Sequence, residues 1–173
     1  MRFSIHALLT FTASLALAAC NPTFNWRDVR PEGTRLSLLM PCKPDKAQKI
    51  VPMAGQPTPL MLLSCDAGGV TFAAAVMDVS DASRVATTLS QWQSATLVNM
   101  KAAPASSISA IQLTGLASGG VMVKATGQRA NGQVVKSQAA YFVQGSQVFQ
   151  AVMYADTIAP DVAETFFSGL KFE

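Results

Sequence analysis

The chain has 173 residues, of which 13 are lysine or arginine and 10 are aspartate or glutamate. A net charge of +3 at pH 7, without a cluster of basic residues, is too weak to indicate a nucleic-acid-binding surface. The length allows one domain with a substantial core and argues against a second independent domain.

Residues 1–19 have the three parts of a secretory signal in the required order. Arg2 supplies a positive charge, an apolar run extends from Ala7 to Ala19, and small residues lead into Cys20. The run is shorter than the roughly 20 residues that a membrane-spanning helix needs. We therefore interpret residues 1–19 as a cleaved signal peptide and leave them out of the fold.

The end of this segment, Leu17-Ala18-Ala19-Cys20, resembles the lipobox of bacterial lipoproteins. The resemblance implies cleavage before Cys20 and acylation of that cysteine, and two or more acyl chains make a membrane anchor stable. Asn21 stands where an aspartate would retain an enterobacterial lipoprotein in the inner membrane. We therefore expect a cell-envelope protein that faces the periplasm, with the outer membrane favoured. Ordinary signal cleavage that leaves Cys20 free is the alternative.

Cysteine counting predicts one structural disulfide. Once Cys20 is lipidated, Cys42 and Cys65 remain, and the space outside the inner membrane is oxidising. A zinc site would need further ligands, and the single histidine, His6, leaves with the signal. The pair also lacks the Cys-x-x-Cys spacing of redox-active cysteines. We therefore expect a Cys42–Cys65 disulfide, no metal site and no cofactor.

Residues 20–33 are expected to form a lipidated tether, in which packing of Trp26 on the domain is favoured over contact with lipid headgroups. A single domain is expected at residues 34–173. Apolar runs bounded by prolines and glycines predict its first strands at 34–40, 60–65 and 70–79, the last buried on both faces. A solvated loop is expected between the first two strands, and it carries Lys43, Lys46 and Lys49. Contact of these lysines with anionic lipid headgroups is the alternative.

A helix is predicted to begin at Asp81, where Ser80 or Asp81 can accept hydrogen bonds from its first amides. Its inner face is marked by residues that recur with helical spacing: Val85, Leu89, Trp92, Thr96 and Met100. Such a stripe predicts packing against a sheet.

The second half of the chain is rich in predicted strands. Asn131-Gly132 is a strong signal for a tight hairpin turn, and Gly145-Ser146 provides another turn. A helix is predicted at Pro160–Ser168, ended by Gly169. The strands around these turns are expected at 107–113, 120–130, 133–144 and 148–154, and the last three form an antiparallel meander.

This order predicts an α+β fold: a mainly antiparallel sheet packed with one long central helix and a C-terminal helix. Leu38–Pro44, the central helix, the Asn131-Gly132 hairpin and Phe166–Phe172 resemble the PsbP-like family, which includes DcrB-type envelope lipoproteins. The resemblance would cover residues 33–173 and implies a PsbP-like sandwich. Members bind partner proteins or assist membrane complexes and generally lack enzymatic activity. The family has no common active-site motif, so no functional residue is carried over.

The mature chain lacks the residues of common catalytic sites. It has no histidine for a hydrolase triad, and Asp78 and Asp81 are interpreted as caps. The leading hypothesis is therefore a non-catalytic accessory domain that docks on an envelope protein complex. The alternative is a periplasmic carrier or sensor of a small hydrophobic ligand, and an enzyme without histidine is the third. Adaptable methionines, otherwise core residues, could line the carrier's cavity: Met61, Met77, Met122 and Met153.

Overall fold

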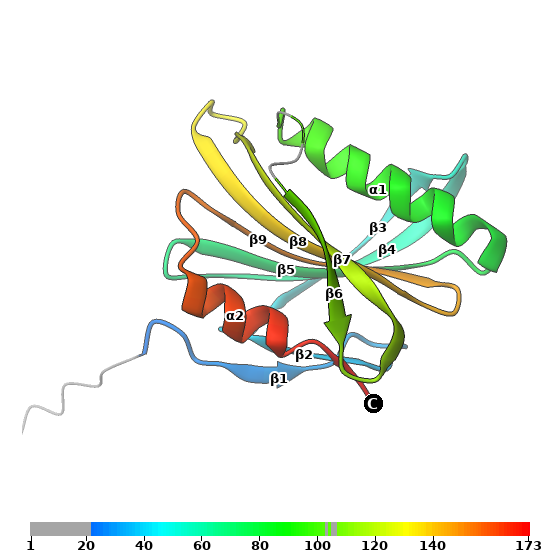
Figure 1. Cartoon of the computed structure of the whole chain (residues 1–173), viewed down its shortest axis with the longest axis horizontal. Helices are drawn as coiled ribbons and strands as arrows, with labels where there is room; N and C mark the ends of the chain where they lie inside the picture. The colour runs from blue at the N-terminus through cyan, green and yellow to red at the C-terminus, as the bar shows by residue number, and fades with distance from the viewer. Residues whose placement is uncertain (1–21, 103, 105–106) are drawn as a thin grey trace, which may run out of the picture.

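The computed structural model describes residues 22–102, 104 and 107–173 (Figure 1). Its body is a seven-stranded antiparallel sheet in the order β3-β4-β5-β9-β8-β7-β6, and a smaller sheet has the order β1-β2-β10. The strands of the larger sheet are β3 (Asp45–Met53), β4 (Gln56–Ala67), β5 (Val70–Asp78), β6 (Ser107–Leu113), β7 (Leu116–Gln128), β8 (Val134–Gln144) and β9 (Gln147–Ala155). The other elements are β1 (Arg27–Val29), β2 (Leu36–Met40), α1 (Val85–Asn99), α2 (Pro160–Ser168) and β10 (Lys171–Phe172).

The strand content corrects the expected fold class. Strands make up 54% of the described residues and helices 18%, so the fold is a β-rich sandwich, and the expected α+β fold with one long central helix is wrong. The segment of lysines that was expected to be a loop is the edge strand β3, paired with β4 along its whole length. Because nearly all its side chains are exposed, β3 lacks the apolar alternation by which a strand is recognised in a sequence.

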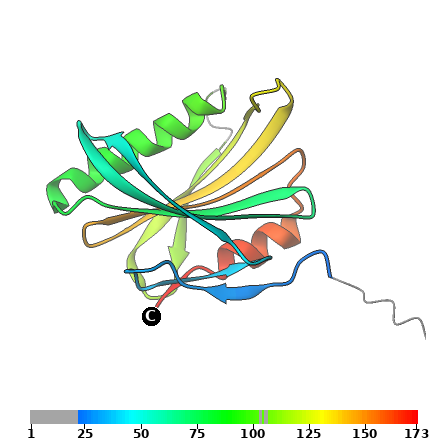
Figure 2. The same cartoon turned by 180° about the vertical axis from the view of Figure 1, so that it is seen from behind.

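The larger sheet has a hydrophobic core on each face. On one face, α1 covers a core that includes Met77, Tyr141 and Val152. On the other face, α2 and the smaller sheet enclose a larger core around Phe72, Phe149 and other buried residues. The two views in Figures 1 and 2 show α1 and α2 on opposite sides of the larger sheet. Strand β5 contributes to both cores, which confirms its predicted burial on both faces.

Helix α1 forms from the predicted stripe, with Trp92 and Met100 buried beneath it. A short 3-10 turn at Ala82–Arg84 precedes it, and the Asp81 carboxylate accepts the Ser83 N–H there at 2.9 Å. At the other end, the Met100 carbonyl accepts the Gln128 N–H at 2.6 Å. The neighbouring Gly127 has no room for a Cβ, because one would overlap the Met100 carbonyl. The C-terminal end of α1 is thus fixed on β7. Separately, no described helix is long and apolar enough to cross a membrane.

The meander of β7, β8 and β9 is confirmed, but its first turn differs from the expected one. The Arg129 N–H donates to the Gln133 carbonyl at 2.8 Å, and the Gly132 N–H donates to the Arg129 carbonyl at 2.9 Å. Only Gly132 in this loop has a positive φ, of 83°. A tight two-residue turn would need a positive φ at Asn131 as well. The chain instead makes a longer loop closed by the glycine.

The segment that precedes β2 belongs to the fold from Phe24 onward. The ring of Phe24 stacks on Trp26, and both rings meet Phe72 edge to face, with centroids 6.2 and 5.9 Å away. The Asn25 N–H donates to the Pro41 carbonyl at 2.8 Å, and β1 then pairs with β2. Trp26 therefore packs on the domain, as the favoured interpretation has it.

Candidate functional site

Of the predicted site residues, the structure describes two. Cys42 and Cys65 form a disulfide, with their Cα atoms 6.1 Å apart, whereas Cys20 lies outside the described residues. Cys42 follows β2 of the smaller sheet, and Cys65 lies in β4 of the larger sheet. The disulfide therefore joins the two layers of the sandwich covalently.

The acidic residues that could have suggested chemistry have structural roles. Asp78 accepts hydrogen bonds from the Ser80 N–H and the Ser146 hydroxyl, both at 2.8 Å. Asp156 pairs with Arg129 at 3.3 Å. Asp161 lies in the first turn of α2, where a negative charge is favourable. Within the described ranges, no three cysteine, aspartate or glutamate side chains gather closely enough to hold a metal ion.

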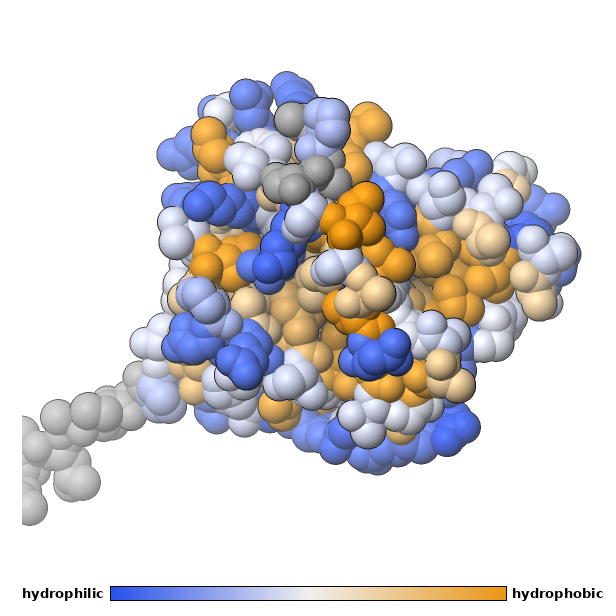
Figure 3. Space-filling view, viewed as in Figure 1, coloured by the Kyte–Doolittle hydropathy of each residue, from blue (hydrophilic) through white to orange (hydrophobic). Residues whose placement is uncertain are grey.

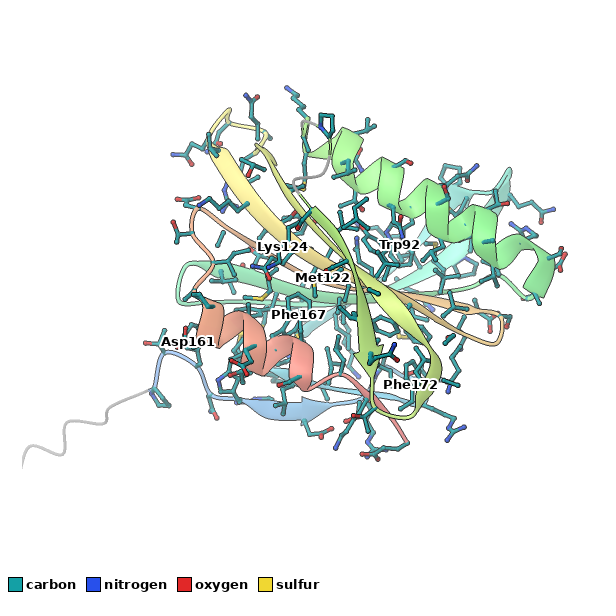
Figure 4. All side chains as sticks on the ribbon, viewed as in Figure 1. Trp92, Met122, Lys124, Asp161, Phe167 and Phe172 are labelled. Carbon is teal, nitrogen blue, oxygen red and sulfur yellow. A yellow bond between two sulfur atoms is a disulfide. The ribbon has the colours of Figure 1, made fainter. Side chains whose placement is uncertain are left out.

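A groove of about 420 Å³ opens between the C-terminal half of α1 and the larger sheet. Figure 4 shows Trp92 beneath α1 on this side of the sheet. The groove is lined by residues of α1, β5, β7, β8 and β9: Thr71, Trp92, Thr96, Asn99, Met100, Gln128, Arg129, Ala130, Val135, Gln150 and Tyr154. Two aromatic rings, amides, hydroxyls and one guanidinium thus share a single surface.

A hydrogen-bond network holds the polar wall of this groove in place. The buried Gln150 amide donates to the Tyr141 hydroxyl at 2.8 Å and to the Thr96 hydroxyl at 3.0 Å. The Thr96 hydroxyl in turn donates to the Trp92 carbonyl at 2.9 Å. These bonds satisfy polar groups that are shielded from water. Because they run from Thr96 through Gln150 to Tyr141, they also join α1 to β9 and β8.

Two tyrosines beside the groove have altered ionisation. Burial raises the pKa of Tyr154 to about 12, with a further contribution from the nearby Tyr141. Burial also raises the pKa of Tyr141, against hydrogen bonds from Thr96 and Gln150 that lower it. Both phenols are therefore neutral at physiological pH.

We expect Tyr154 to make stability pH-dependent in strong alkali. Its folded pKa of about 12 exceeds the unfolded value of 10.0, so its contribution is complete below pH 10 and is lost toward pH 12. The free energy of unfolding of the wild type should fall by up to about 3 kcal/mol over this range through Tyr154 alone. Urea unfolding of the wild type and of Tyr154→Phe at several pH values measures this loss. If the free energy of unfolding fell equally with pH in the two proteins, the raised pKa of Tyr154 would be contradicted.

The four methionines proposed to line a ligand cavity do not gather around one. Met77 belongs to the core under α1, whereas Met122 and Met153 belong to the core on the opposite face. Met61 borders a different, shallow pocket beside Asp78. The methionines therefore fill two separate cores.

The two edges of the larger sheet differ in how they are protected. Strand β3 carries Lys46, Lys49 and Pro52, all exposed, which discourage pairing with another strand. Strand β6 has the sequence Ser-Ile-Ser-Ala-Ile-Gln-Leu, without a charge or proline, and among the described residues it pairs only with β7 along its length. Ile108 in β6 is 67% exposed. Figure 3 shows apolar side chains at the surface between α1 and β6.

Comparisons with known proteins identify no family. No family model matches the chain, and no curated protein matches it. A crystal structure of a protein from Bacteroides thetaiotaomicron aligns with a TM-score of 0.46 and 12% identity, over 80% of this chain and 45% of that one. This chain thus spans less than half of that protein's length. A likeness at this level gives no information about function. The PsbP-like resemblance stays a prediction.

Sequence reasoning missed both the groove and the open edge. The groove combines residues from five elements, so its composition depends on how α1 crosses the sheet. The lack of charge in residues 107–113 is visible in the sequence, but that this strand lies at an edge follows only from the strand order.

Proposed function

We propose that the chain is a non-catalytic lipoprotein of the cell envelope, anchored through Cys20 and serving as an interaction domain for an envelope protein complex. The Leu17–Cys20 segment supports the anchor, and Asn21 favours the outer membrane. The disulfide between Cys42 and Cys65 is in keeping with an oxidising compartment.

The observation that carries the interaction role is the open edge of β6. In an antiparallel pair, an edge strand directs a share of its N–H and C=O groups away from its neighbour, where another strand can bind them. Exposed edges of this kind accept an extended segment of a partner, which adds a strand to the sheet. The end of β6 is shielded, because the Phe172 N–H donates to the Thr114 carbonyl at 2.8 Å. An extended partner peptide would therefore lie along residues 107–112.

We expect Ile108→Lys to abolish partner binding, because a lysine on an edge strand blocks strand addition. Ile50→Lys is the matched control, since Ile50 lies on the opposite edge strand and is also 67% exposed. Acylated protein is crosslinked in membranes, purified by affinity and analysed by mass spectrometry. A recurrent partner should accompany the wild type and Ile50→Lys and be absent from Ile108→Lys.

Two outcomes would contradict the proposal. Equal recovery of the partner with both lysine variants would rule out binding at β6. Absence of any recurrent partner with the wild type would rule out the accessory role altogether. A Cys20→Ser variant should leave the membrane fraction, and its retention there would argue against the lipid anchor.

A further inference from the structure

The length of chain between Cys20 and the folded domain is very small. Among the described residues, which begin at residue 22, Phe24 is the first that packs on the core, through Trp26 and Phe72. Four residue steps therefore separate it from Cys20, and even a fully extended chain would span at most about 14 Å. The headgroup layer of a bilayer is itself roughly 6 Å thick on each side. A lipid on Cys20 would leave almost no free tether above the membrane surface.

From this distance we infer that one particular end of the domain faces the lipid surface, an inference that rests on the proposed lipid anchor. This membrane-proximal end comprises Thr23–Phe24, the β4–β5 turn at Gly68-Gly69 and the loop between β9 and α2. A Cβ on Gly68 would lie 2.6 Å from the Phe24 ring, so this turn is in contact with the start of the domain. The partner at this end is the bilayer itself.

The arrangement of elements shows which parts share this end and which lie opposite. In Figures 1 and 2, the start of the domain, the β4–β5 turn and the start of α2 lie at the same end of the long axis. Figure 4 places Asp161 at that end as well. The β3–β4 and β8–β9 turns lie at the other end in both views. They would project away from the membrane.

The packing of Phe24 makes this orientation a property of the fold and not only of the anchor. Its ring is held by Trp26 and by Phe72, which is fully buried, and the Asn25 N–H is bonded to the Pro41 carbonyl. These contacts leave the chain no flexible linker after Phe24 about which the domain could turn over. The acyl chains supply the attachment, so a bilayer without net charge is sufficient.

Fluorescence quenching by the lipid tests the orientation. With Cys20 acylated and Cys42 joined to Cys65, a new cysteine would be the only free thiol for a dye. Thr157→Cys, in the exposed β9–α2 loop, reports on the proximal end, and Gln56→Cys, beside the β3–β4 turn, reports on the distal end. The acylated full-length protein is placed in phosphatidylcholine vesicles that contain headgroup-nitroxide lipid. We expect several-fold stronger quenching at residue 157 than at residue 56.

A longer tether provides the matched control. About 16 glycine and serine residues inserted after Asn21 would have a root-mean-square reach of roughly 22 Å, so the difference in quenching should largely disappear. Equal quenching at the two sites in the acylated protein without the insert would overturn the orientation alone. Mass spectrometry of the N-terminal peptide distinguishes a wrong orientation from a missing anchor. An unacylated Cys20 would overturn the proposed function and the orientation together.

Discussion

Replacing Phe72 with alanine is expected to lower the free energy of unfolding by about 3–5 kcal/mol, the range found for large aromatic residues in protein cores. Phe72 is fully buried in β5, and its ring meets Phe24, Trp26 and Phe166 edge to face. Its removal would leave a cavity and also release the first residues of the domain. Urea unfolding, followed by the fluorescence of the tryptophans, measures the loss.

A matched variant separates the cavity from the loss of the aromatic ring. Phe72→Leu keeps most of the volume and should cost clearly less than Phe72→Ala, because volume-conserving exchanges are tolerated best. Phe24→Ala should cost less than Phe72→Ala, since Phe24 is only partly buried. A loss below about 1 kcal/mol for Phe72→Ala would mean that this ring is not a central part of the core.

Removing the disulfide is expected to destabilise the domain by about 3 kcal/mol, as the chain-entropy model gives for a loop of this length. Cys42 and Cys65 are 23 residues apart in sequence, and their link restricts the unfolded chain. The double variant Cys42→Ala/Cys65→Ala removes the link without leaving a free thiol. Urea unfolding of the oxidised wild type, the reduced wild type and this variant measures the difference.

The reduced wild type and the double variant should unfold at similar urea concentrations, and reductant should leave the variant unchanged. Equal stability of the oxidised and reduced wild type would show that the disulfide does not contribute to the fold. Thiol titration of the wild type under denaturing conditions, with and without reductant, establishes the oxidation state of each sample.

Several local elements were predictable because their signals are local. The stripe of Val85, Leu89 and Trp92 predicted α1, and Pro160 with Gly169 marked the bounds of α2. Two remaining cysteines predicted the disulfide. The fold class was not predictable in the same way, because nine residues of β3 are recognisable as a strand only through their pairing with β4. Long strands whose sequences mix apolar, polar and proline residues, such as β4, were underestimated for the same reason.

The candidate sites depend on interactions between distant parts of the chain. Gln150 is an ordinary strand residue in the sequence, and only the crossing of α1 over β9 brings it to Thr96. Likewise, Ile108 lies on an open edge because β6 is the last strand in the sheet order. Strand order and the crossing of a helix over a sheet are determined by the whole core, so sequence motifs do not predict them.

If the chain is exported as proposed, the covalent link between the two layers would also give that export a direction. The proposed export would begin in a reducing compartment, where Cys42 and Cys65 would remain thiols and the two sheets would be held by non-covalent contacts alone. The domain would then be less stable before translocation than after it, by the contribution of the disulfide. Oxidation after the proposed crossing would oppose return of the chain, because the chain would be hardest to unfold on that side of the membrane.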